Sequence, residues 1–100
     1  MKKPLPRPKS IFVDVDGTLI SKSGQINTNL IKSLWSWKAK GYQLYLWSMN
    51  GSAHANRAVS RCGCEGLFEA VLSKPGVIVD DRGLEWLQGA PLLGPSGLAP

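Results

Sequence analysis

Apolar runs alternate along the chain with segments in which apolar residues recur at helical spacing. Short runs of β-branched, aromatic or leucine residues, each closed by glycine or polar residues, predict buried strands. They occupy residues 11–13, 44–47 and 77–79, and residues 68–72 form a further, less regular candidate. The runs at 11–13 and 77–79 each end directly at an aspartate.

The segments between these strands predict helices. In the first, Asn27 or Thr28 can cap the N-terminus, and Gly41 ends the helix after a basic last turn. In the second, Ser52 can cap the N-terminus and Gly63 ends the helix. The apolar stripes of the two helices contain Leu30, Ile31, Leu34 and Trp35, and Ala55, Ala58, Val59 and Cys62.

Strands that alternate with helices predict an α/β fold. Each strand–helix–strand unit gives a parallel pair of strands, and a parallel sheet is normally covered by helices on both faces. The chain of 100 residues suffices for one such domain, which we place at residues 11–88 with a short helix over 84–88. Residues 1–10 form a basic, proline-rich lead-in, and residues 89–100 an irregular tail without periodicity.

The composition narrows the class of protein. A hydrophobic share of 43% is ordinary for a globular domain and excludes general disorder. No apolar run approaches the roughly 18 residues of a membrane span, and no apolar signal-peptide core follows the N-terminus. We therefore expect a cytoplasmic protein without membrane contact. Cys62 and Cys64, with His54 as the single histidine, are too few for an ordinary zinc site.

Charge is distributed unevenly along the chain. Twelve Lys and Arg residues stand against seven Asp and Glu residues, which gives a net charge of +5. All the aspartates lie in two short segments, Asp14/Asp16 and Asp80/Asp81, so the rest of the chain is strongly basic. A basic body around a concentrated acidic site suits an anionic substrate held beside a cation.

The aspartate pairs are candidates for a metal site. Asp14 and Asp16 follow a predicted strand and precede Gly17, where the chain can turn, so both carboxylates can reach the space above the sheet edge. Two close carboxylates repel each other unless a cation or a proton lies between them, and Mg²⁺ accepts one or two carboxylates while keeping waters for a phosphate. Asp80 and Asp81 repeat this arrangement after another predicted strand, although aspartates are also common in turns.

Other polar residues near predicted strand ends suit a phosphate group. Ser48 offers a hydroxyl, and the turn that follows it, with Met49 and Asn50, offers backbone N–H groups. Lys74 supplies a positive charge to a reaction in which charge changes on oxygen. Taken alone, each reads as an ordinary turn or surface residue, so their convergence on one sheet edge is what indicates a site. His54, early in the second predicted helix, lies near that edge.

The segment Asp14-Val15-Asp16-Gly17-Thr18-Leu19 after a hydrophobic strand resembles the first motif of the haloacid dehalogenase (HAD) superfamily. Ser48, Lys74 and the pair Asp80-Asp81 resemble its second, third and fourth motifs, in the family's order. The resemblance spans residues 11–82. It implies a three-layer, Rossmann-like fold with a mainly parallel sheet. Because Asp16 is the phosphatase-type feature of the first motif, the resemblance implies a phosphatase rather than a dehalogenase.

The resemblance also implies a role for each site residue. Asp14 would attack phosphorus to give an aspartyl-phosphate, and Asp16 would protonate the leaving oxygen and then activate water. Mg²⁺ would be bound by the Asp14 carboxylate, the Asp16 backbone carbonyl and the carboxylate of Asp81, with Asp80 supporting Lys74. The transferring phosphoryl group would be held by Ser48, Met49, Asn50 and Lys74.

The chain leaves no room for a cap domain, either after Thr18 or between Leu72 and Lys74. Relatives use such caps to close over small metabolites. An open site therefore suggests a bulky phosphorylated substrate, such as a nucleic-acid end or a phosphoprotein, or a homo-oligomer in which the neighbouring subunit acts as the lid. The basic lead-in and the helix lysines favour a nucleotide or polynucleotide over a small metabolite.

A second hypothesis is a non-catalytic binding or regulatory module on the same fold, contacting nucleic acid or a partner protein. The small size, the missing cap and the basic surface suggest it. Such a module would not need both Asp14 and Asp16, so the presence of the pair favours the Mg²⁺-dependent phosphatase.

Overall fold

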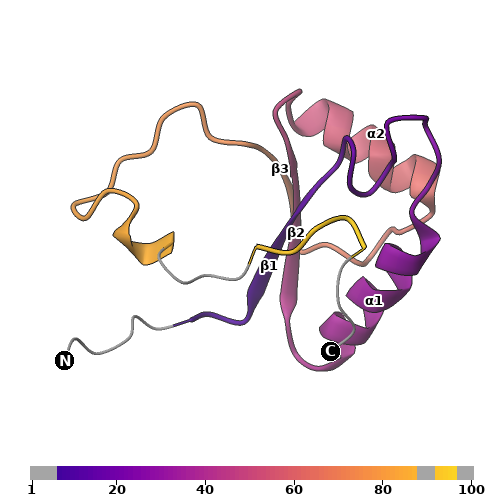
Figure 1. Ribbon diagram of the computed structural model, residues 1–100, viewed down its shortest axis with the longest axis horizontal. Helices are drawn as coiled ribbons and strands as arrows, with labels where there is room; N and C mark the ends of the chain where they lie inside the picture. The colour runs from indigo at the N-terminus through magenta and orange to yellow at the C-terminus, as the bar shows by residue number, and fades with distance from the viewer. Residues whose placement is uncertain (1–6, 88–91, 97–100) are drawn as a thin grey trace.

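The computed structural model of the protein describes residues 7–87 and 92–96 (Figure 1). Its strands are β1 (Ser10–Asp14), β2 (Gln43–Ser48) and β3 (Ala70–Ser73). Its helices are α1 (Thr28–Ala39), α2 (Ser52–Cys62) and the short 3₁₀ helix η1 (Glu85–Leu87). The strands expected over 11–13, 44–47 and 68–72 and the two main helices are thereby confirmed. The expected lead-in and tail lie partly outside the described residues.

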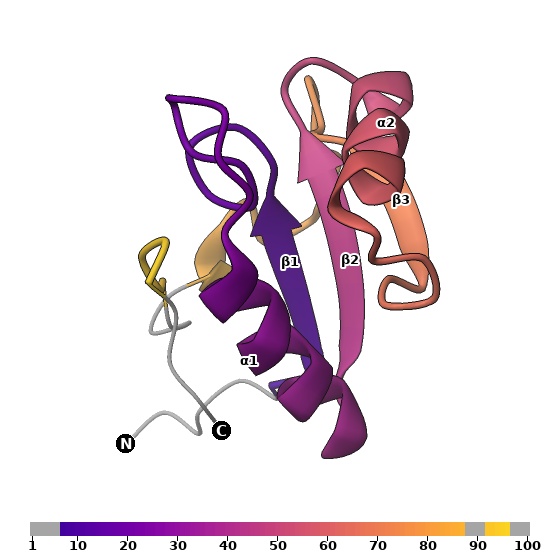
Figure 2. The same cartoon turned by 90° about the vertical axis from the view of Figure 1, so that its right-hand side faces the viewer.

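The strands form a parallel sheet in the order β1-β2-β3, as the alternation of strands and helices predicts. In this register Asp14 lies opposite Trp47 of the central strand, and Trp47 lies opposite Leu72. All three strands therefore end at the same edge of the sheet, at the top of Figure 2. The chain is an α/β protein with a three-stranded parallel sheet and two α-helices in the described residues, which is consistent with a Rossmann-like layout.

The hydrophobic core lies between one face of the sheet and the helices α1 and α2. Alternate residues of a strand point to opposite faces, and Val13, Leu44 and Leu46 occupy the face beneath the helices. The buried core consists of Val13, Val15, Leu19, Leu30, Leu34, Leu44, Leu46, Ala55, Ala58, Cys64 and Leu67. Trp35, expected on the apolar stripe of α1, is instead 42% exposed.

The boundaries of both helices follow from local hydrogen bonds and glycine conformations. Asn27 caps α1, because its Oδ1 accepts a hydrogen bond of 3.1 Å from the backbone N–H of Leu30. Gly63 ends α2 in the left-handed conformation, with φ of 63°. Ser52 is the first residue of α2 rather than its cap, since Gly51 occupies the N-cap position.

The three-layer arrangement is not found in the described residues. Figure 1 shows α1 and α2 on the same side of the sheet. The opposite face carries the aromatic side chains of Phe12, Tyr45 and Trp47, and no α-helix of the described chain covers it. Phe12 packs against Tyr45 and Trp47 with ring centroids 4.8 and 4.7 Å apart. The fold is therefore two-layered where the structure describes it.

The fourth expected strand, over residues 77–79, is wrong. Residues 75–87, which we call the arm, leave β3 and run out on the side of the sheet away from α1 and α2 (Figure 1). Val77 and Val79 are 84% and 97% exposed and Ile78 is 50% exposed, and the run pairs with none of the strands of the described chain. Pro75 lacks a backbone donor and Gly76 is flexible, which allows the chain to turn away before a strand can form.

The short helix expected over 84–88 is present as η1, and residue 88 lies outside the described residues. η1 has no close backbone contact with any other helix or strand of the described chain. Within the same residues, no helix has the length and apolar character required to cross a bilayer.

Truncation of the central core is expected to destabilise the protein strongly. Leu46 is fully buried on β2, so Leu46→Ala should lower the free energy of unfolding by about 2–5 kcal/mol through lost burial and the resulting cavity. The measurement is urea unfolding followed by circular dichroism. Leu72→Ala on β3, where the side chain is 38% exposed, is the matched control and should cost less than about 1 kcal/mol. Equal losses in the two variants would contradict this assignment of the core.

Candidate functional site

The site lies where the three parallel strands end. Asp14 is the last residue of β1, Ser48 is the last residue of β2, and Lys74 follows β3 directly. The backbone N–H of Lys74 donates to the carbonyl oxygen of Ser48 at 2.9 Å, which extends the pairing of β2 and β3 by one residue. The register of the sheet thus brings these residues to one edge, as the sequence predicts.

An ion pair between Asp14 and Lys74 forms the centre of the site. Lys74 Nζ lies 3.2 Å from Asp14 Oδ1, and both side chains are about one-third exposed. Thr18 Oγ1 donates to the other carboxylate oxygen of Asp14 at 3.4 Å. Lys74 Nζ also lies 5.9 Å from the centroid of the Trp47 ring, within reach of a cation–π contact. The carboxylate of Asp14 is therefore oriented from two sides and remains accessible to solvent.

The loop after β1 holds its residues by backbone hydrogen bonds. Gly17 adopts a φ of 80°, which permits the turn that follows Asp16. The N–H of Gly17 donates to the carbonyl of Ile20 at 2.8 Å, and Leu19, fully buried, anchors the loop in the core. The Gly-Thr-Leu sequence after Asp16 therefore has a structural explanation, since each residue shapes or anchors this loop.

Asp16 is held by two residues from the region of α2. His54 Nε2 lies 3.1 and 3.0 Å from its two carboxylate oxygens. Asn50 Nδ2 donates to Asp16 Oδ2 at 3.1 Å. The hydrogen bond from His54 is the main cause of a pKa of Asp16 below its ordinary 3.8. Burial opposes it, while hydrogen bonds from Asn50 and Ser48 and the electrostatic effect of His54 add to the lowering, so the net pKa is lowered. Asp16 is thus a carboxylate with a fixed orientation at neutral pH.

The sequence alone does not predict the contact of His54 with Asp16, because it places His54 only near the site edge. The signal available is its position in the first turn of the helix that follows β2, because such helices begin at the ligand-binding edge of a parallel sheet. Because His54 lies in the first turn of α2, the N-terminal end of this helix, which carries the positive end of its dipole, is near Asp16.

The residues expected to hold a phosphate differ in how exposed their side chains are and in which groups they already contact. The Ser48 side chain is 1% exposed, and its Oγ accepts a hydrogen bond of 3.0 Å from the backbone N–H of Asn50. Asn50 thus directs its backbone N–H to Ser48 and its side chain to Asp16. Met49 is 77% exposed. Of the expected phosphate-binding groups, Lys74 alone presents a charged atom beside Asp14.

Asp80 and Asp81 are not brought together with Asp14 and Asp16. They lie in the arm as exposed residues, and Asp80 Oδ1 accepts a hydrogen bond of 2.8 Å from the backbone N–H of Arg82, which is the geometry of a turn. Among residues 7–87 and 92–96, no three His, Cys, Asp or Glu side chains are close enough to hold a metal ion together. The missing fourth strand explains this, because that strand would have carried the second pair to the sheet edge.

The donor set still fits Mg²⁺ in its usual mode of binding. Asp14 and Asp16 supply hard carboxylate oxygens that are open to solvent. Mg²⁺ commonly binds through one or two carboxylates, keeps several waters and takes its remaining oxygens from a substrate phosphate. The pair suits an ion shared with a substrate, and it does not suit a closed, all-protein cage.

The chain was compared with models of protein families, with curated proteins and with solved structures, and no match was found in any of the three comparisons. The chemistry of the site is therefore inferred from its own residues and their geometry.

The lowered pKa of Asp16 is expected to depend on His54. In the native protein the carboxyl group should titrate below 3.8, and in His54→Ala its pKa should rise toward that value because the main stabilising hydrogen bond is lost. Since the folded pKa is the lower one, the contribution of Asp16 to stability is present above pH 3.8 and is lost as the pH falls through the folded value. The measurement is the ¹³C carboxyl shift of Asp16 during an NMR pH titration. Asn56→Ala, at an exposed position of α2, is the control. An unchanged midpoint in His54→Ala would contradict the assignment.

Proposed function

We propose that the protein is a Mg²⁺-dependent phosphomonoester hydrolase whose nucleophile is Asp14. The observation that supports it most is the contact between the Asp14 carboxylate and the Lys74 ammonium group at the strand ends, 3.2 Å apart and open to solvent. A nucleophile beside a cation suits attack on a dianionic phosphate, since the cation offsets the repulsion between carboxylate and phosphate. The HAD-like order of the sequence motifs supports the same reaction.

In the first step, an oxygen of Asp14 forms a bond to phosphorus while the bond from phosphorus to the ester oxygen breaks. The leaving oxygen takes up a proton and departs as an alcohol. Lys74 stabilises the negative charge of the phosphoryl oxygens, and Thr18 holds the second oxygen of Asp14 while the first faces Lys74.

In the second step, a water molecule hydrolyses the aspartyl-phosphate and regenerates Asp14. Asp16 is suited to accept the proton of that water, because its lowered pKa keeps it ionised at neutral pH. The same lowered pKa leaves Asp16 without a proton to donate in the first step, so the leaving oxygen takes its proton from solvent water, and the proton that Asp16 accepts in the second step returns to solvent. The sum of the two steps consumes one water and releases inorganic phosphate.

Mg²⁺ would be held by Asp14 and Asp16, and when bound it neutralises charge on the phosphoryl oxygens. Asp14 then has two cationic neighbours in the proposed site, the metal and Lys74. The function of Lys74 is to keep a positive charge at this position before the substrate and its metal arrive.

Removal of the proposed nucleophile should abolish turnover. The purified protein with Mg²⁺ should release phosphate from an aryl phosphate, and Asp14→Asn should lower kcat by at least about a thousandfold. The measurement is the release of the aryl alcohol or of phosphate over time. Glu65→Gln, which neutralises an exposed carboxylate outside the site, is the matched control and should retain activity. Equal rates for Asp14→Asn and the unaltered protein would contradict the proposal.

Removal of the metal should also abolish turnover, and this loss should be reversible. Treatment with a chelator should reduce hydrolysis of the aryl phosphate to the level of Asp14→Asn, and added Mg²⁺ should restore it, because phosphate and carboxylate repel each other without the cation. Ca²⁺ serves as the comparison, since its larger and more flexible coordination sphere fits this chemistry poorly. Full activity in the chelator would contradict a metal-dependent reaction.

A non-catalytic binding module is the second candidate. Two observations favour it. Asp14 is already paired with Lys74, and the described residues bring no third carboxylate to the site for a metal ion. A protein of this kind would show no turnover in a broad screen of phosphomonoesters, and it would bind nucleic acid with an affinity that falls steeply as salt is added. The aryl phosphate experiment separates the two candidates.

A further inference from the structure

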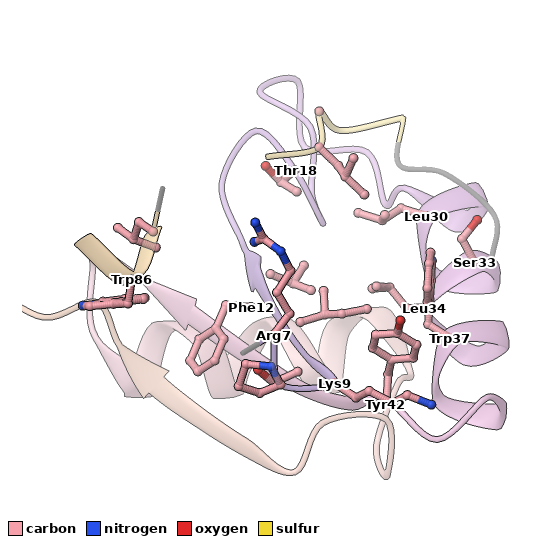
Figure 3. A pocket seen from close by; sticks show the side chains of 17 residues that line it. Arg7, Lys9, Phe12, Thr18, Leu30, Ser33, Leu34, Trp37, Tyr42 and Trp86 are labelled. Atoms are coloured by element: carbon pink, nitrogen blue, oxygen red, sulfur yellow. The ribbon is translucent and has the colours of Figure 1, made fainter. Parts of the chain in front are cut away.

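A groove of about 520 Å³ lies along the free edge of β1 (Figure 3). β1 is an edge strand of the sheet, because among residues 7–87 and 92–96 it pairs with β2 alone. Residues of β1 and α1 line the groove, and Trp86 and Leu87 of η1 and residues 93–94 also contribute to it. A volume in the range of about 300–1,000 Å³ is typical of sites that bind small molecules or parts of larger ligands.

The groove reaches the proposed reaction site. Thr18, whose hydroxyl donates to Asp14 at 3.4 Å, also lines the groove. Phe12, two residues before Asp14 on the same face of β1, lines it as well. A substrate that presents its phosphate to Asp14 can therefore extend its body into this space.

The lining of the groove combines aromatic and cationic side chains. Four aromatic residues contribute to it from separate parts of the chain, namely Phe12, Trp37, Tyr42 and Trp86. Arg7 and Lys9 contribute the charges, and no acidic residue is among the described lining residues. Figure 3 shows the guanidinium group of Arg7 pointing into the groove. Lys9 Nζ lies 5.8 Å from the ring centroid of Tyr42.

This chemistry identifies the ligand class. Aromatic side chains stack on bases of any sequence, and Arg and Lys neutralise backbone phosphates, which is how single-stranded nucleic acids are bound without sequence preference. We propose that the groove holds the terminal nucleotides of a single-stranded nucleic acid whose end phosphate is presented to Asp14. The role of the end phosphate in this inference rests on the proposed phosphatase function. The binding of a single-stranded nucleic acid rests on the groove alone.

Other classes of phosphorylated ligand match the lining of the groove less well. A purely apolar phosphomonoester would leave Arg7 and Lys9 without an anionic partner in the groove. A phosphopeptide could supply anions, but its amide backbone has no aromatic faces to stack on the rings of the groove, as a row of bases has. The net charge of +5 agrees with a polyanionic ligand and gives a long-range attraction toward it.

The test is a binding measurement with the inactive variant Asp14→Asn, so that the probe is not consumed. The probes are fluorescently labelled oligothymidylates with a phosphate at the 5′ end, with a phosphate at the 3′ end, or with neither. An end-phosphorylated probe should bind more tightly than the unphosphorylated one. Adding Arg7→Gln should weaken binding about tenfold and reduce the salt dependence by about one phosphate contact. Trp86→Leu should weaken binding by a similar factor through lost stacking.

Arg82→Gln is the matched control, because Arg82 is an exposed arginine that does not line the groove. Equal weakening by Arg7→Gln and Arg82→Gln would overturn the inference, and so would a phosphopeptide that binds as tightly as the end-phosphorylated oligonucleotide. If the protein hydrolyses aryl phosphate but its binding of the oligonucleotides does not depend on Arg7, the groove assignment is overturned and the proposed phosphatase function is not. Arg7-dependent binding without any turnover would overturn the proposed phosphatase and leave the nucleic-acid groove supported.

Discussion

The burial of β2 between two neighbouring strands and beneath two helices is the constraint on which the rest of the structure depends. Leu44 and Leu46 are fully buried, and a slip of one residue would turn both toward the uncovered face. The register that prevents this slip also places Asp14 opposite Trp47 and brings Lys74 to the same edge. The carboxylate and its cation are thus brought together by the packing of leucines rather than by their own attraction.

The charged pairs at this edge contribute little to stability. Side chains of Asp14, Asp16, His54 and Lys74 are between 29% and 54% exposed, and ion pairs in such surroundings are screened by water. Collecting them at the ends of parallel strands therefore has no clear structural benefit. Charges gathered at a strand edge without a structural benefit are typical of sites that bind or transform a ligand.

The sequence predicts the parts of this structure that depend on local pattern. The runs at 11–13 and 44–47 are apolar because they cross the core, and Asn27 and Gly63 set helix ends through local hydrogen bonds and backbone freedom. The run at 77–79 has the same composition, but a strand also needs a partner and a buried face, which pattern alone does not reveal. The contact of His54 with Asp16 depends on how α2 packs against the sheet, and so it too required the three-dimensional arrangement.

The alternation of side chains along β1 has a consequence for how the protein can change. Val13 of β1 and Val15 just after it are buried, and they are interleaved with Phe12, Asp14 and Asp16, which face away from the core. Substitution at Phe12, which lines the groove beside the proposed catalytic residues, leaves the buried packing intact, so a change in the proposed ligand preference would be largely uncoupled from folding. A chain of this size can therefore diverge in specificity through single changes, without first acquiring compensating mutations in its interior.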